Sequence, residues 1–207
     1  MDLHLWLAFV AASAAIGAIP GPAVTSIVGY ALGSGRKVAL ASVGGMVVGN
    51  LICMTLSMAG VGAILAASAL AFSMLKWAGA LYLIGLGLWT LWKARRLTAE
   101  HIAPPPPISA RAAFMSNVAL GIFHPKTIVF FVAFAPQFIG AHAAYWPQAA
   151  ILIVTFAAVV GATDTTYALA ASHTAALLRR PKTLLWSRRA SGGVLIAAGV
   201  ATAAARR

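Results

Sequence analysis

Long charge-free stretches alternate with short basic segments along this chain. Asp, Glu, Lys and Arg are absent from residues 3–35, 38–75, 77–92, 112–125, 127–163, 165–178 and 190–205. A helix of about 20 apolar residues crosses the ~30 Å hydrocarbon core of a bilayer. The pattern therefore predicts an integral membrane protein built from transmembrane helices.

We predict six transmembrane helices and an all-α fold. The helices cover about residues 3–32, 38–63, 75–92, 112–138, 148–172 and 190–205. Pro20, Gly21 and Pro22 lie in the middle of the first helix, and Pro125 lies in the middle of the fourth. Proline removes a helical hydrogen bond and clashes with the preceding turn. We therefore expect the first and fourth helices to be broken at these points.

A run of four prolines at residues 104–107 separates two halves of three helices each. Such a run favours an extended polyproline conformation, so we expect a cytoplasmic linker over about residues 97–110. Each half opens with a proline-broken helix. Because three is an odd number, the second half (about 111–207) would cross the membrane in the opposite direction to the first (about 1–96). We expect a single transporter domain over residues 1–207, built from two inverted repeats.

Composition supports a lipid environment for this chain. Hydrophobic residues make up 61% and charged residues only 9%, with a mean hydropathy of +0.91. Soluble domains carry about 25% charged residues, so the composition argues against a soluble enzyme. Cys53 is the sole cysteine; it can form no internal disulfide and no metal site by itself.

The net charge of +12 comes from 15 Lys and Arg against 3 Asp and Glu. The basic residues lie between apolar runs rather than on a polar face, so nucleic acid is not an expected partner. Eleven of them fall in the loops after the first, third and fifth predicted helices, whereas the other side carries Lys76, Arg206 and Arg207. The positive-inside rule places those three loops in the cytoplasm and both termini on the periplasmic or extracellular side.

Two charged residues, Lys126 and Asp164, fall inside predicted spans. Lys126 follows Arg111 by 15 positions, about 22 Å of helix, and Asp164 precedes Arg179 by the same number. Insertion scales assign about 2.5–3.5 kcal/mol to such a residue at the centre of a span. We expect the two side chains to pair. The pair is either purely structural or provides a carboxylate that titrates or yields to a charged solute.

Further polar candidates adjoin these positions. His124 precedes Pro125 and either titrates or packs as a hydrogen-bonded side chain. Asn50 can bond the broken backbone of the first helix, and Gly45 and Gly49 form a small-xxx-small pair that permits close helix packing. The expected translocation path comprises Pro20, Gly21, Pro22, Asn50, His124, Pro125, Lys126 and Asp164. No His, Cys and Asp cluster has metal-ligand spacing, so neither a metal nor a cofactor is expected.

The chain resembles the L-lysine exporter and homoserine/threonine resistance family, LysE/RhtB, over nearly its whole length. The shared motifs are Pro20-Gly21-Pro22, Gly33-Ser34-Gly35-Arg36, Gly45 to Asn50, KWAGALYLIGLG at 76–87, Pro125-Lys126 and Ala135-Pro136-Gln137-Phe138. The resemblance implies an exporter of amino acids and related small solutes across the bacterial inner membrane, driven by an ion gradient. Family members usually carry Asn before Pro-Lys, whereas this chain has His124; this departure bears on substrate identity and proton coupling.

We therefore expect a proton-driven, alternating-access exporter of amino acids or related zwitterions rather than an enzyme. A second hypothesis is an exporter of metal cations or other toxic small molecules, which a lysine in the path disfavours. An intramembrane enzyme would need a nucleophile partnered with a base, and a passive scaffold would leave Lys126 and Asp164 with no role beyond packing. The expected partners are a small solute, membrane lipid and protons, and the glycine-rich faces permit a homo-oligomer.

Overall fold

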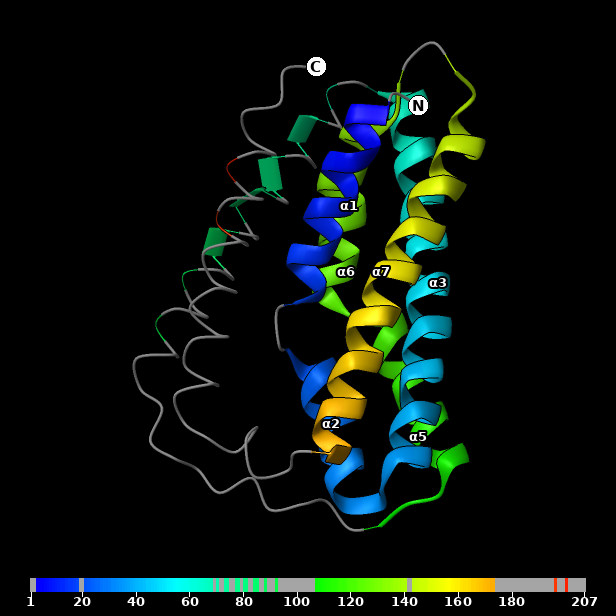
Figure 1. Ribbon diagram of the computed structural model, residues 1–207. Helices are drawn as coiled ribbons and strands as arrows, with labels where there is room; N and C mark the ends of the chain where they lie inside the picture. Colours follow the sequence, from blue (N-terminus) through cyan, green and yellow to red (C-terminus); the bar gives the residue numbers. More distant parts are fainter. Residues whose placement is uncertain are drawn as a thin grey trace.

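The computed structural model describes residues 3–18, 21–68, 107–140 and 143–173, with isolated positions between 70 and 92 and at 196 and 200. All regular secondary structure in these ranges is helical (Figure 1). The elements are α1 (Leu3–Gly17), α2 (Pro22–Ser34), α3 (Arg36–Ala67), α5 (Ala110–Ile122), α6 (Pro125–Val129), the π-helix η1 (Phe130–Phe134), the 3-10 helix η2 (Ala135–Phe138) and α7 (Tyr145–His173). The all-α prediction is confirmed for this part of the chain.

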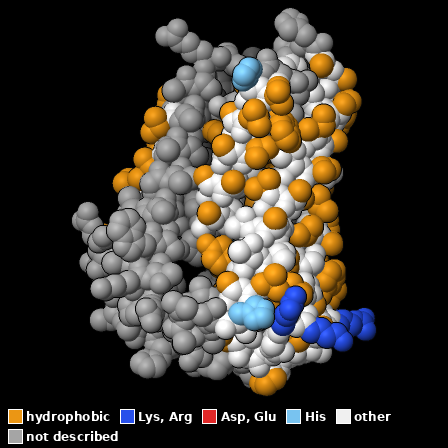
Figure 2. Space-filling model, viewed as in Figure 1, with side chains coloured by type: hydrophobic (Ala, Val, Ile, Leu, Met, Phe, Trp, Pro, Cys, Tyr) orange, Lys and Arg blue, Asp and Glu red, His pale blue; other side chains and the backbone are white. Residues whose placement is uncertain are grey.

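Three helical stretches of the described chain are long and apolar enough to cross a membrane: Arg36–Ile64, Ala110–Phe138 and Tyr145–His173. The bent pair α1 and α2, whose axes differ by 55°, passes the same test as one span. These stretches correspond to the second, fourth, fifth and first predicted helices. The third and sixth, at about 75–92 and 190–205, lie outside the continuously described residues. Apolar side chains spread over the described outer face, as contact with lipid requires (Figure 2).

Both predicted helix breaks are present, and they have the same local cause. A residue that precedes proline is pushed into extended backbone. Gly21, before Pro22, has φ −122° and ψ −164°, and His124, before Pro125, has φ −73° and ψ 101°. Each proline then opens a new helix, where its missing N–H leaves no hydrogen bond unmade. Pro20 itself lies outside the described residues.

The two broken helices run in opposite directions (Figure 1). The α1 segment lies toward the end of the molecule that holds the N-terminus, and α2 continues toward the opposite end. The α5 segment starts at that opposite end, and α6 continues back toward the N-terminal end. Between them, α3 packs against α2, α5 and α7, and α7 also packs against α1 and α2. The arrangement brings the two breaks together inside the bundle.

Glycines set the distance between α3 and α5. A Cβ atom placed on Gly45 or Gly49 would overlap backbone carbonyl oxygens of α5. A Cβ atom on Gly121 of α5 would lie 2.9 Å from the backbone nitrogen of Asn50. The close approach predicted from the small-xxx-small pair is therefore confirmed, and it holds Asn50 beside the second break.

A cluster of six phenylalanines packs between α1, the segment that follows α6, and α7. Neighbouring ring centroids are 4.9 to 6.3 Å apart, with several edge-to-face pairs, the geometry that aromatic rings favour. This phenylalanine cluster consists of Phe9, Phe130, Phe131, Phe134, Phe138 and Phe156, all buried. The π-helical and 3-10 turns of η1 and η2 carry four of these rings, so the irregular backbone there is tightly packed.

Gly49→Ala is expected to destabilise the protein, because the added methyl group must displace the backbone of α5. Overpacking of this kind typically costs about 1–3 kcal/mol. Gly60→Ala, in the same helix, is the matched control, since nothing lies within 4 Å of its added Cβ. Thermal unfolding of the purified proteins in detergent measures the difference. Equal melting temperatures for the two variants would contradict the close α3–α5 packing.

Candidate functional site

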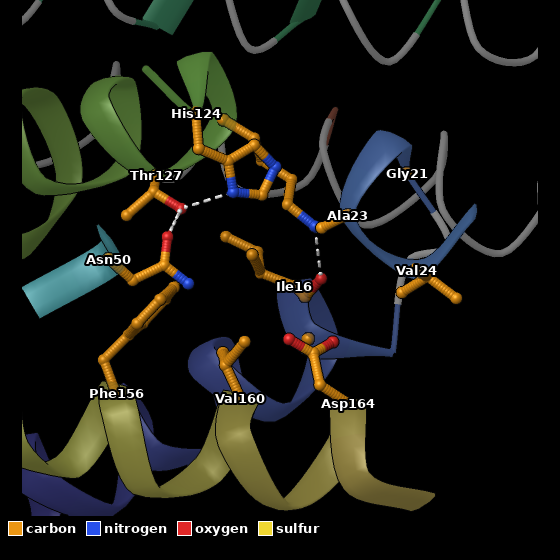
Figure 3. Close-up of a pocket in the computed structure, with 12 residues that line it drawn as sticks. Ile16, Gly21, Ala23, Val24, Asn50, His124, Thr127, Phe156, Val160 and Asp164 are labelled. Carbon is orange, nitrogen blue, oxygen red and sulfur yellow. Dashed lines mark hydrogen bonds between the residues drawn. The ribbon is translucent and has the colours of Figure 1, made fainter. Parts of the chain in front are cut away.

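Five of the residues predicted from sequence line one pocket where the two helix breaks meet. They are Gly21, Asn50, His124, Lys126 and Asp164, joined by side chains of α1, α2, α6 and α7 (Figure 3). The pocket has room for about one water molecule. Pro22 and Pro125 do not line it; both are exposed and serve to begin α2 and α6.

Lys126 reaches from the first turn of α6 to the end of α1. Its ammonium donates a 2.9 Å hydrogen bond to the carbonyl oxygen of Ile16. Tyr167 of α7 donates through its hydroxyl to the carbonyl oxygen of Ala18, also at 2.9 Å. The carbonyl end of a helix carries partial negative charge and favours a cation. One side chain from each of α6 and α7 thus bonds a backbone carbonyl at the broken end of the first helix.

Asp164 faces the same pocket from α7 and is only 2% exposed. The predicted direct pair with Lys126 is not formed: no Asp164 oxygen lies within 4 Å of the Lys126 ammonium. The free carbonyl of Ile16 takes the ammonium instead. No hydrogen bond joins the Asp164 side chain to any other described residue. Two opposite charges therefore flank one small space and interact electrostatically across it.

A chain of hydrogen bonds lines another wall of the pocket. The Thr127 hydroxyl lies 3.1 Å from Nδ1 of His124 and 3.4 Å from the side-chain oxygen of Asn50. All three side chains are buried. When His124 donates through Nδ1 to Thr127, the Thr127 hydroxyl donates in turn to the side-chain oxygen of Asn50. Asn50 was predicted to bond the broken backbone of the first helix; it is instead bonded beside the second break.

Two polar residues in this region were missed from the sequence. Asn117 of α5 is fully buried; it accepts a 3.0 Å hydrogen bond from the Ser26 hydroxyl and donates at 3.1 Å to the backbone carbonyl of Ser42. It thereby links α2, α3 and α5. Thr127 is the other. An amide inside a charge-free span requires a hydrogen-bonding partner, and that requirement is the signal that could have identified Asn117.

Apolar helices that are broken inside the bundle beside Lys126 and Asp164 are consistent with a membrane protein. The chain belongs to the LysE type translocator family, whose sequence model matches residues 5–205. The family resemblance seen in the motifs is thus confirmed.

Individual relatives cover most or all of the chain. A homoserine/homoserine lactone efflux protein of Salmonella typhimurium is 32% identical over 206 residues, spanning 100% of this chain and 99% of the relative. An uncharacterized membrane protein of Vibrio cholerae is 30% identical over 207 residues, spanning both chains fully. A leucine efflux protein of Enterobacter sp. is 29% identical over 154 residues, 74% of this chain and 72% of the relative. No solved structure matches.

Lys126 and Asp164 are expected to be energetically coupled even though they do not touch. Lys126→Met leaves the buried Asp164 carboxylate without a nearby cation, which costs free energy of folding. Adding Asp164→Asn removes the negative charge and with it this cost. The double variant is therefore expected to be more stable than the sum of the two single effects by about 1 kcal/mol or more. Unfolding of all four proteins in detergent measures this coupling.

The matched control cycle combines Asp164→Asn with Lys37→Met, because Lys37 is exposed at the start of α3. In this control, the changes in the free energy of unfolding caused by the two substitutions should add to within about 0.3–0.5 kcal/mol. Equal additivity in both cycles would show that the pocket charges do not sense each other.

Proposed function

We propose that this protein is an inner-membrane exporter of amino acids or related small zwitterions. The pocket carries the proposal, because the Lys126 ammonium and the buried carboxylate of Asp164 flank one space inside an apolar bundle. A zwitterion bears the two complementary charges: Lys126 receives its carboxylate and Asp164 its ammonium. Family membership, and relatives named as homoserine and leucine efflux proteins, support the same class of solute.

The broken helices add to this recognition. The α2 helix begins at the pocket, and its N-terminal end contributes partial positive charge toward a carboxylate. The carbonyl end of α1 contributes partial negative charge on the other side. Discontinuous helices supply polar backbone groups to solutes in this way in many secondary transporters.

Export through this pocket requires a conformational change, because an amino acid does not fit in the space of one water molecule. We propose that six spans form two inverted repeats, over about residues 1–96 and 111–207, that rock against each other to alternate access. The opposite directions of the α1–α2 and α5–α6 breaks support this symmetry. Phe156 of the phenylalanine cluster lines the pocket in the described conformation.

The distribution of basic residues supports an orientation. Helices α3 and α5 begin at the end of the bundle opposite the N-terminus (Figure 1). The first turns of these helices carry exposed basic side chains at Arg36, Lys37 and Arg111, and Figure 2 shows Lys and Arg side chains at this end. By the positive-inside rule this end faces the cytoplasm. The N-terminus then faces the periplasm or the exterior, and six spans put the C-terminus on the same side.

Coupling to protons is assigned to Asp164, with His124 as a second candidate. Protonation of Asp164 would discharge the carboxylate when no solute ammonium is present, which lowers the cost of moving it through a closed state. Export of metal cations, the alternative hypothesis, finds no specific support in the described residues. They contain no group of three His, Cys, Asp or Glu side chains suited to a metal ion, and the Lys126 ammonium lines the pocket.

The test is efflux of a panel of labelled amino acids from preloaded cells that express the protein. We expect efflux of one group of amino acids. Lys126→Met or Asp164→Asn is expected to reduce it by at least about tenfold, as the loss of a hydrogen bond to a charged group predicts.

Thr166→Val is the matched control, since Thr166 is exposed on α7 two residues from Asp164 and bonds only within its own helix. All variants are compared at equal membrane expression. Absence of amino-acid efflux from correctly inserted wild-type protein would contradict the proposal, as would unchanged efflux in both charge variants.

A further inference from the structure

The side-chain amide of Asn50 lines the pocket with a hydrogen-bond donor that has no acceptor among the described residues. The charged groups of a zwitterion held by Lys126 and Asp164 do not account for this donor. The oxygen of the Asn50 carboxamide is bonded by Thr127, and its amide nitrogen is turned into the pocket (Figure 3). Asn50 is only 3% exposed, and its amide nitrogen donates to no other described residue. A buried donor without an acceptor costs about 1–3 kcal/mol, and such exceptions call for a specific explanation.

Helix α7 lines the pocket across from the Asn50 amide with one charged side chain followed by two apolar ones. Asp164, Val160 and Phe156 are spaced by four residues, so they lie on one stripe of the helix. Asp164 lies about 12 Å along the helix from Phe156. Figure 3 shows Asn50 next to Phe156, away from Asp164. A solute whose ammonium meets Asp164 would therefore extend its side chain past Val160 toward Asn50.

We infer that Asn50 is a specificity-determining residue, which donates a hydrogen bond to an oxygen atom in the side chain of the exported amino acid. Val160 and Phe156 pack against the intervening methylene groups. The solute class is a small amino acid whose short side chain ends in a hydroxyl or carbonyl oxygen. This inference rests on the proposed function, because the head group must first be held between Lys126 and Asp164.

Thr127 and His124 act as positioning residues for Asn50. The Thr127 hydroxyl holds the oxygen of the carboxamide, and His124 Nδ1 orients that hydroxyl. The amide nitrogen is thereby directed into the pocket rather than toward α6. A site that presents a fixed hydrogen-bond donor discriminates strongly against analogues that lack the acceptor. The selection therefore favours oxygen-bearing side chains over aliphatic ones of similar size.

The test measures the efflux of labelled homoserine and leucine from the same preloaded cells, expressed as a ratio of rates. Asn50→Leu is expected to lower the homoserine-to-leucine ratio by about tenfold, the value of one lost hydrogen bond. Thr127→Val is expected to lower it severalfold, and Thr127→Ser, which keeps the hydroxyl, is expected to restore it. The control is Thr55→Val, an exposed position on the same helix as Asn50 whose hydroxyl bonds only to Leu51; it should leave the ratio at the wild-type value.

The ratio separates recognition from structural damage. If Asn50→Leu and Thr127→Val reduce both solutes to the same fraction, Asn50 is structural and the inference is wrong. Should Asn50→Leu fail to insert, the near-isosteric Thr127→Val and Thr127→Ser pair decides. An unchanged ratio with intact wild-type efflux overturns this inference alone. Correctly inserted wild-type protein that exports other amino acids, but none whose side chain ends in a hydroxyl or carbonyl oxygen, overturns this inference alone. Wild-type protein that exports no amino acid of the panel overturns the proposed function as well.

Discussion

In a bilayer every backbone N–H and C=O group must find its partner inside the protein. The hydrogen bond from Lys126 to Ile16 is where this constraint acts most clearly in the described structure. The break in the first helix leaves carbonyl groups without their helical donors, and an ammonium from the second break satisfies one of them. A lysine inside a span and a broken helix are each costly alone. Here the lysine ammonium and the freed carbonyl satisfy each other at the edge of the pocket.

The remaining contacts hold the two breaks in register. Glycines on α3 and α5 let the two backbones touch, which places Asn50 beside the start of α6. Asn117 links α2 to α3 and α5 through Ser26 and Ser42. Such interhelical hydrogen bonds are worth about 0.6 kcal/mol on average in membranes, so their role is alignment more than bulk stability. A pocket aligned in this way can be opened by moving one broken helix relative to the other.

The sequence was sufficient for features that arise from local chemistry. Proline at residues 22 and 125 breaks a helix wherever it falls in a span, and both breaks are present. The positions of Lys126 and Asp164 in charge-free spans likewise indicated that they face the interior, and both line the pocket.

The sequence did not predict which hydrogen-bond partner a buried side chain would meet, because several groups that are distant in sequence compete for it in the folded protein. Charge reasoning paired Lys126 with Asp164, whereas the nearer acceptor is a backbone carbonyl that exists only because the helix is broken. Thr127 was missed because a hydroxyl in a helix commonly bonds its own backbone. The π-helical and 3-10 turns after α6 were not predicted, although Pro136, which has no backbone N–H, lies within them.

The central claim is that Lys126 recognises the carboxylate of a zwitterionic solute. It is tested most directly by calorimetric titration of the purified protein with homoserine and with its carboxamide, which lacks the negative charge, for wild type and Lys126→Met. The account predicts that wild type binds homoserine at least about tenfold more tightly than the carboxamide, and that the variant binds the two with nearly equal affinity. The same preference for homoserine in both proteins would contradict it.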